Sequence, residues 1–445
     1  MGRASMSSAY LPAYGPPTGL PTRDAQPASL FSQGGIAACL IGIASGIPFQ
    51  TVGRLFIGEL LLMAIAPVVV LLLLGLSDQY GKTARTVLLA MAVSLAGYVI
   101  SDVIRGTPSH DFLRGWSRWI AMGASFATLA WLGSKNIGYV TAFLFGLAIG
   151  TCLSPFVVGG AFGIKVFWKF YAGFPVCIMV LLLTSRMSPW ISCASLLGLA
   201  VLSVTLDFRS LALLCILASG ISWLSMRRTA SQKKSRRPIS KTSMVAAAAA
   251  IFVIMALAVS FIQFLGERYG YAERFRRSNA TRMISATVTW SAIKESPLIG
   301  YGSWPRDAEL ARLRDRLVTE AKGNATFRTE AQDDLIIAHS QILQGWLEGG
   351  LLGLTFFAWL AWQLIRQLTW LALASPYLPL TPVIAFMQLA CAWNLVFSPF
   401  SGSQRIYIPA TCIFICYIAA KRHELRRFTA LPAMSYRPPA YAATP

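Results

Sequence analysis

Apolar residues recur along the chain in blocks, and the length of these blocks predicts membrane-spanning helices. Each block is continuous instead of alternating between apolar and polar positions, which favours helices over the strands of a membrane β-barrel. About 20 apolar residues span a bilayer core as a helix. On this basis we expect twelve spans, at residues 33–50, 54–76, 85–104, 116–133, 136–154, 166–184, 189–206, 208–226, 244–265, 340–362, 380–397 and 405–420.

Composition agrees with this pattern. Of 445 residues, 55% are hydrophobic and only 13% are charged, whereas a soluble chain of this length needs more charge to cover its surface. The eight cysteines lie in or beside apolar blocks without the spacing of a metal site, so we interpret them as small helix residues. The sequence therefore predicts an all-α polytopic membrane protein.

Basic residues predict the orientation of these spans. If the N-terminus lies in the cytoplasm, the short basic connections fall inside, among them residues 226–243, with seven Lys or Arg and no acidic residue. Residues 421–427 also fall inside, so both termini are expected in the cytoplasm. The net charge of +21 is then explained by topology, and we do not expect a nucleic-acid partner. Membrane lipids are the simpler partner for the basic loop.

Residues 266–338 form the one large hydrophilic loop that this topology leaves on the outer face. The loop carries twelve Lys or Arg and ten Asp or Glu, a mixed composition that is compatible with folding. Residues 281–296 and 308–323 space their apolar positions as amphipathic helices do, and they are expected to lie on the membrane or to cap a cavity. Between them, Gly300 and Gly302 permit a sharp chain reversal.

Three polar side chains lie where the predicted topology brings the chain to this face. Arg209, in the turn between the seventh and eighth spans, is an interfacial arginine, a partner of Asp207, or a ligand-binding charge. Arg282 is either a solvated charge or a ligand. His339, where the loop re-enters the membrane, is either bonded to the backbone at a helix start or a proton acceptor.

In their order and spacing, these pieces resemble the motifs of the O-antigen ligase and polymerase family of bacterial membrane glycosyltransferases. The resemblance covers residues 190–362. Ser340 stands where asparagine is frequent in that family, and Asp-Phe precedes Arg209 where small residues are usual, which leaves the subfamily open. The matching pieces are Arg209-Ser210, Arg282 with Trp290, the turn Pro297–Gly302, and His339-Ser340 followed by a helix with Glu348, Gly350 and Gly353.

The resemblance implies a GT-C-like fold and a metal-independent inverting enzyme without a cofactor. Such an enzyme moves a glycan from undecaprenyl diphosphate to a glycan or lipid-linked acceptor on the periplasmic face of the inner membrane. Arginine guanidinium groups can neutralise and orient the diphosphate without a metal. We therefore expect Arg209 and Arg282 to hold the diphosphate and His339 to deprotonate or orient the acceptor hydroxyl.

Other residues have a weaker claim on the same chemistry. Arg114, Arg118 and Arg405 are outward in the predicted topology, and they are candidates for contacts with the diphosphate or glycan, or else interfacial arginines. Glu348 lies within the predicted helix that follows His339. A carboxylate inside a membrane is a functional candidate, but a structural Glu–Arg pair is equally consistent with the sequence.

Four units follow from this interpretation. We expect a disordered tail without the pattern of a cleaved signal peptide, a block of N-terminal transmembrane helices, an O-antigen-ligase-like core, and a cytoplasmic C-terminal tail. The core includes the cytoplasmic basic loop 226–243 and the periplasmic loop 266–338. The four units span residues 1–32, 33–206, 207–420 and 421–445.

Polymerisation of repeat units of a surface polysaccharide or exopolysaccharide is the function that we favour from the sequence. A ligase that joins finished glycan to lipid A core or another anchor shares the same motifs. A flippase or transporter of lipid-linked oligosaccharide is a further alternative, although the chain has no internal repeat. A metal-dependent oligosaccharyltransferase would need an acidic cluster on the outer face, where Asp102 and Asp111 are instead flanked by arginines.

Overall fold

A computed structural model of the protein describes residues 32–50, 54–157, 159, 163–231, 272–322, 334–400 and 402–430. Within these residues the chain is almost entirely helical, which confirms the predicted all-α class. The predicted span 244–265, the disordered tail and most of the basic loop 226–243 lie outside the described residues.

From α1 to α9 the helices follow one another with short connections, and one antiparallel hairpin, β1 (Pro48–Gln50) with β2 (Arg54–Phe56), joins the first two. A short π-helix, η1 (Trp168–Ala172), links α6 to α7. The described helices are α1 (Gln33–Gly46), α2 (Ile57–Leu74), α3 (Gln79–Arg105), α4 (Ser109–Lys135), α5 (Ile137–Val157), α6 (Ile164–Phe167), α7 (Gly173–Thr184), α8 (Pro189–Thr205), α9 (Arg209–Ser231), α11 (Ala272–Glu295), α12 (Ala308–Lys322), α13 (Gln341–Leu373), α14 (Thr381–Phe397) and α15 (Gln404–Ala430).

Every predicted span within the described residues coincides with a helix, but several boundaries differ. The hairpin takes residues that were expected in the first two spans. Helices α13 and α15 continue to Leu373 and Ala430, past the predicted ends at 362 and 420, because backbone hydrogen bonds carry a helix beyond its apolar segment. Residues 421–430, expected as part of a tail, are therefore the last turns of α15.

Six stretches of helix among the described residues are long and apolar enough to cross a membrane, as in a multi-pass membrane protein. Helices α1, α8 and α14 are apolar but shorter. A total of twelve spans thus stays a prediction. The stretches that meet the criterion are Ile57–Leu74, Gln79–Arg105, Ile137–Val157, Ile164–Thr184, Arg209–Thr229 and Gln341–Leu373.

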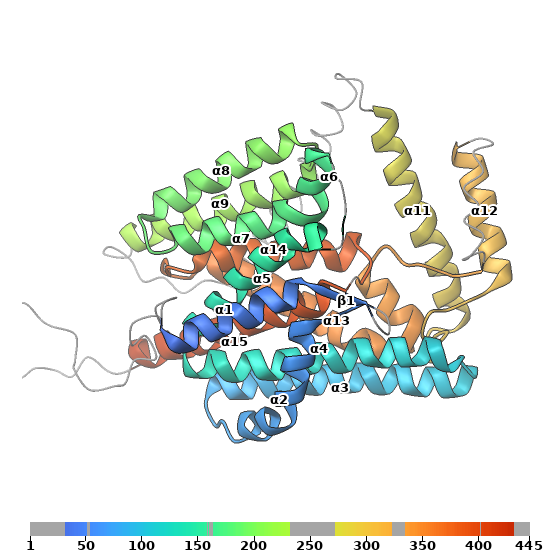
Figure 1. Cartoon of the computed structure of the whole chain (residues 1–445), viewed down its shortest axis with the longest axis horizontal. Coiled ribbons are helices and arrows are strands. Elements are labelled where there is room, and N and C mark those ends of the chain that lie inside the picture. Colours follow the sequence, from blue (N-terminus) through green and yellow to red (C-terminus); the bar gives the residue numbers. More distant parts are fainter. Residues whose placement is uncertain are drawn as a thin grey trace, which may run out of the picture.

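Helices α11 and α12, from the predicted outer loop, stand apart from the other helices at one end of the bundle (Figure 1). Both predicted amphipathic stretches are helices here. Buried apolar side chains from α11, α12, the segment before α13 and the first turns of α13 form one cluster that is separate from the main core. Its buried members are Ile284, Val288, Ala292, Ile293, Leu310, Ile336 and Leu347.

Helices α3 and α13 pack closely through glycines, and this contact fixes the geometry at the same end of the bundle. A side chain at Gly97 would meet the backbone nitrogen of Gly353 at 2.6 Å and the carbonyl oxygen of Gly349 at 2.7 Å. Small residues allow such close approach between membrane helices. As a result Tyr98, which follows Gly97, lies directly against α13.

Candidate functional site

Helix α13 is kinked at Gly350, and the turn after α11 forms hydrogen bonds with the backbone at this kink. Gly350 has φ 60° and ψ −154°, so two carbonyl groups of the preceding turn lose their helical partners. The backbone N–H of Tyr301 donates to the carbonyl oxygen of Leu347 at 2.7 Å, and that of Gly302 donates to the carbonyl oxygen of Glu348 at 3.0 Å. The Pro-Leu-Ile-Gly-Tyr-Gly turn is therefore docked on the kink of α13.

Glycine is required on both sides of this contact. Gly300 and Gly302 have φ values of 82° and 81°, which other residues rarely adopt. A Cβ atom at Gly300 would lie 2.5 Å from the backbone nitrogen of Gly350, and one at Gly350 would clash with the carbonyl oxygen of Leu298. The two glycine-bearing motifs recognised in the sequence thus fit against each other.

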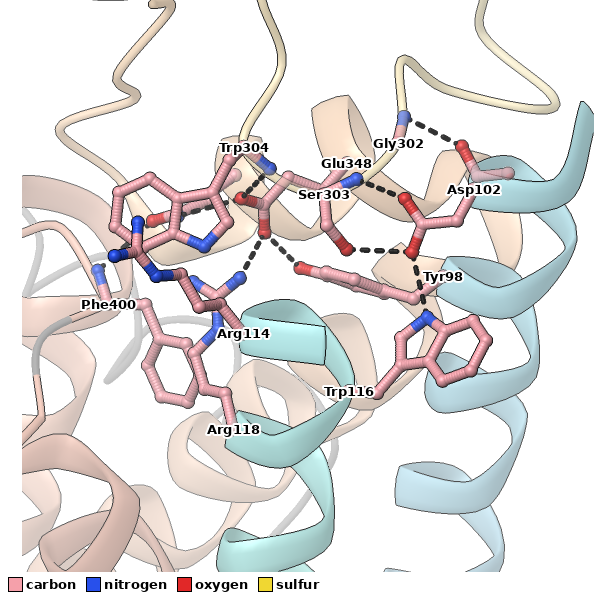
Figure 2. Close-up of polar contacts among 12 residues, drawn as sticks. Tyr98, Asp102, Arg114, Trp116, Arg118, Gly302, Ser303, Trp304, Glu348 and Phe400 are labelled. Atoms are coloured by element: carbon pink, nitrogen blue, oxygen red, sulfur yellow. Dashed lines mark hydrogen bonds and ion pairs between the residues drawn. The ribbon is translucent and has the colours of Figure 1, made fainter. Parts of the chain in front are cut away.

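The kink places the carboxylate of Glu348 against the side chains of Tyr98 and Arg118 and the backbone N–H of Trp304 (Figure 2). With Gln344, one turn earlier on α13, these residues form what we call the Glu348 cluster: Tyr98, Arg118, Trp304, Gln344 and Glu348. The Tyr98 hydroxyl donates to Oε2 at 2.7 Å, and Arg118 Nη2 donates to the same oxygen at 2.8 Å. Gln344 Nε2 donates to Oε1 at 3.3 Å. Because Arg118 and Glu348 are both buried, each charge depends on the other for compensation.

Aromatic rings surround the Arg118 guanidinium. Its central carbon lies 5.2 Å from the ring centre of Phe400 and 6.0 Å from that of Trp304. Arg114, one turn earlier on α4, is exposed and lies 5.7 Å from the Trp304 ring. Such cation–π contacts add to the ion pair and fix the orientation of both arginines. Arg114 therefore remains accessible to a ligand, while Arg118 faces inward (Figure 2).

A second buried carboxylate holds the docked turn against α3 and α4. Asp102 accepts hydrogen bonds from Trp116 Nε1 at 2.8 Å, from the backbone N–H of Ser303 at 2.5 Å, and from Ser303 Oγ at 2.8 Å (Figure 2). Nearby, Arg105 Nε donates to the carbonyl oxygen of Gly300 at 2.9 Å. Asp102 thus has donors on both oxygens, a role that the sequence did not reveal.

Arg282 and His339, predicted to act together, are close enough to interact electrostatically. His339 precedes α13, whose N-cap Ser340 accepts a hydrogen bond from Leu343 N–H. Burial, and then the positive charge of Arg282, lower the pKa of His339, although a hydrogen bond with the backbone of Ile337 acts in the opposite direction. The neutral imidazole is therefore favoured near pH 7.

Ser285 of α11 fixes the position of the His339 ring. The Nδ1 atom of His339 lies 3.3 Å from Ser285 Oγ, and the backbone N–H of His339 donates to the same oxygen at 3.2 Å. His339 also lines a cavity of about 170 Å³ between α11 and α12, whose wall includes Thr281 and Arg314. A histidine bonded to serine and open to a cavity can accept a proton from a bound hydroxyl.

The remaining arginine candidates each have a carboxylate partner. Arg209 lies 3.4 Å from Asp207, the pairing that the sequence left open. Arg405 forms a bidentate pair with Glu59, with both N–O distances at 2.8 Å, and Glu59 is fully buried. These pairs favour a structural role for Arg405, whereas Arg209 stays partly accessible.

The sequence left open a structural Glu–Arg pair for Glu348, and the structure places Arg118 in that pair. The other residues around Glu348 and Asp102 were not identified from the sequence. Tyr98 and Asp102 lie four positions apart on α3 and so share one face, which was the available indication. Trp116 is 14 positions from Asp102, but Glu348 is 250 positions from Tyr98 and Ser303 is 201 positions from Asp102, and nothing local predicts these distant pairings.

Asp111, the other carboxylate considered for a metal site, lies beside basic side chains. Its Oδ2 atom lies 3.2 Å from His110 Nε2 and 3.6 Å from Arg306 Nε, and Arg306 pairs in turn with Asp334 at 2.9 Å. Among the described residues, no three His, Cys, Asp or Glu side chains are grouped so that they could hold a metal ion.

No protein-family model matches the chain, and no curated protein sequence matches it either.

Proposed function

We propose that the protein is an inner-membrane glycosyltransferase that moves an undecaprenyl-diphosphate-linked glycan to an acceptor sugar on the periplasmic face. Polymerisation of the repeat units of a surface polysaccharide or exopolysaccharide is the form that we favour. The observation that carries the proposal is the proximity of Arg282 to a neutral, cavity-lining His339. These are the two groups that transfer from a diphosphate needs: a cation for the leaving group and a base for the hydroxyl.

In this mechanism the oxygen of the acceptor hydroxyl attacks the anomeric carbon while the bond from that carbon to the diphosphate oxygen breaks. The hydroxyl proton passes to the free nitrogen of the His339 imidazole, since Nδ1 faces Ser285. Arg282, with Arg209 as a second cation, neutralises the charge that develops on the diphosphate. Direct displacement inverts the anomeric configuration.

In this proposal the Glu348 cluster has a positioning role and does not contact the substrate. Glu348 lies two turns after the start of α13, about 10 Å along the helix at 1.5 Å per residue, so it is too far from His339 to share one atom of substrate. Its contacts instead hold the turn after α11, and with it the end of the helix that carries Arg282. We assign Arg118, Arg405 and Glu348 to positioning, and Arg114 to contact with the glycan.

The topology that goes with this function has about twelve spans in a GT-C-like arrangement, with both termini in the cytoplasm. Helices α11 and α12 then belong to the periplasmic loop, beside the ends of α3 and α13 that carry the site. The separate apolar cluster between α11 and α12 supports a folded loop that caps the membrane domain. A ligase would use the same site with a different acceptor.

Deletion of the gene in its host, with complementation by variants, tests the proposal. If the protein is a polymerase, deletion removes long polymer and single lipid-linked repeat units accumulate on a gel. His339→Ala and Arg282→Ala are each expected to fail to complement while the protein still accumulates in the membrane. Arg312→Ala, which changes an exposed arginine on α12, is the matched control and is expected to complement fully.

Full-length polymer that stays on its lipid carrier would identify a ligase instead. Full complementation by His339→Ala, or unchanged lipid-linked pools after deletion, would contradict glycosyl transfer and favour the transport alternative.

A further inference from the structure

A cavity of about 300 Å³ lies among α3, α13 and α15, away from the candidate site. Its wall includes the first turns of α3 and the last turns of α13 and α15. The C-terminal end of α15 lies at the end of the bundle away from α11 and α12 (Figure 1). In the topology proposed above, this is the cytoplasmic end of the protein.

The cavity is strongly cationic. Lys82, Arg366, Arg422 and Arg426 all line it, together with His423, and no Asp or Glu is part of its lining among the described residues. Of the acidic residues next to the lining in sequence, Glu424 pairs with Lys421 at 3.2 Å, and Asp78 accepts a hydrogen bond from the backbone N–H of Gly81 at the start of α3. Lys82 of α3, Arg366 of α13 and Arg422 of α15 therefore bring three positive charges to one cavity, whose lining contains no acidic side chain among the described residues.

This concentration of positive charge is electrostatically costly. Burial, and then the like charges of Arg366 and Arg426, lower the pKa of Arg422 to about 10. Like charges in a partly buried cavity repel one another, and an anion between them removes that cost. Guanidinium groups match phosphate oxygens in geometry as well as in charge.

The other lining residues fit a lipid headgroup at a membrane surface. Trp359 and Trp370 form part of the wall, and tryptophan favours the boundary between the headgroups and the acyl chains. Beside them on α13, Trp362 and Ile365 are 61% and 51% exposed, so an acyl chain has an apolar surface next to the cationic cavity. Gln363 adds an amide donor to the lining.

We propose that this cavity binds a phosphate-bearing anion, and specifically the headgroup of an acidic phospholipid of the cytoplasmic leaflet. Basic pockets between transmembrane helices on the cytoplasmic side bind such headgroups, and each cation near the surface adds to the affinity. The site is separate from the proposed glycosyl transfer, and its occupancy does not depend on that reaction.

Native mass spectrometry of the full-length protein in detergent tests the proposal, with phosphatidylglycerol and phosphatidylcholine as probes. We expect the wild-type protein to bind phosphatidylglycerol at least about tenfold more tightly, as several cation contacts imply. The variant Arg366→Gln/Arg422→Gln is expected to lose this preference. Arg227→Gln is the matched control, because Arg227 is exposed on α9, lies over Trp223 at 4.0 Å and does not line the cavity.

If the double variant does not fold, Arg366→Gln alone replaces it in the test, because Arg366 is exposed.

Inorganic pyrophosphate, as a second probe, distinguishes a lipid headgroup from a soluble phosphate as the ligand. Displacement of phosphatidylglycerol by pyrophosphate supports the shared site. Pyrophosphate binding that the arginine variants abolish, without any lipid preference, would overturn the lipid source and assign the site to a soluble phosphate. Equal binding of both lipids without pyrophosphate binding, or an unchanged lipid preference in both arginine variants, would overturn the proposal.

Discussion

Arg118 of α4 and Glu348 of α13 form a buried ion pair at 2.8 Å although they are 230 positions apart in the chain. The pair joins the two helices just below the turn that carries Gly300 and Gly302. Tyr98 donates to the same carboxylate oxygen from α3, so three helices meet at one atom. The contact therefore links the membrane bundle to the loop that holds the candidate site.

Removal of one member of this pair is expected to destabilise the protein strongly. Arg118→Met leaves the Glu348 charge buried without its cation, at a cost of about 3–5 kcal/mol, while the double variant Arg118→Met/Glu348→Leu costs less because no charge is left behind. The thermal stability of both variants is measured in detergent, with unfolding monitored by size-exclusion chromatography of a fluorescent fusion. Arg114→Met is the control, since this side chain is exposed. A single variant as stable as the control would refute the assigned role.

Gly350 is expected to be intolerant of any side chain. At φ 60° and ψ −154° an L-residue costs about 1–3 kcal/mol in backbone strain, and the Cβ of Gly350→Ala would also clash with the carbonyl oxygen of Leu298. Gly198→Ala is the matched control, because nothing lies within 4 Å of a Cβ there. We expect lower thermal stability and loss of complementation only for Gly350→Ala. Equal behaviour of the two variants would show that the kink is dispensable.

The sequence predicted the helices well because a span of about 20 apolar residues is a local property of the chain. It also identified the turn Pro297–Gly302 and the glycines of α13, since each is an unusual local pattern. It did not predict that these motifs contact each other, nor that Tyr98 and Asp102 hold them in place. Such contacts depend on how distant helices pack, and one sequence contains no record of packing partners.

The charged candidates show the same limit. The sequence does not distinguish an arginine that binds a ligand from one that pairs with a carboxylate of its own chain. The partner of Arg405 is Glu59, 346 positions away, which only the folded bundle brings near. Arg282 and His339 were linked through a family resemblance, and in the structure the charge of Arg282 lowers the pKa of His339.

The bidentate geometry of Arg405 with Glu59 predicts that lysine is a poor substitute. Lysine keeps the charge but offers a single ammonium in place of two aligned N–H donors. We therefore expect Arg405→Lys to lower thermal stability less than Arg405→Ala, which leaves the fully buried carboxylate without its cation. Arg186→Lys, at an exposed position between α7 and α8, is the control. The prediction fails if both Arg405 variants match the wild-type protein.

The pKa of His339 is expected to depend on the charge of Arg282. Burial and that charge both lower it below the ordinary 6.5, so the imidazole stays neutral as pH falls through 6.5 and becomes protonated only at lower pH. Arg282→Gln removes one of the two lowering causes, so the pKa must rise and protonation must begin at higher pH. Arg282→Lys retains the charge and should leave the pKa nearly unchanged.

The extent of modification by diethyl pyrocarbonate, which attacks the neutral imidazole, measures this shift without any assay of transfer. Peptide mass spectrometry separates the modification of His339 from that of His110 and His423. In the wild-type protein the midpoint of His339 should lie below 6.5, and in Arg282→Gln it should move upwards. If the midpoint of His339 is the same in wild type and Arg282→Gln, Arg282 does not control the protonation of His339 and the proposed base loses its electrostatic support.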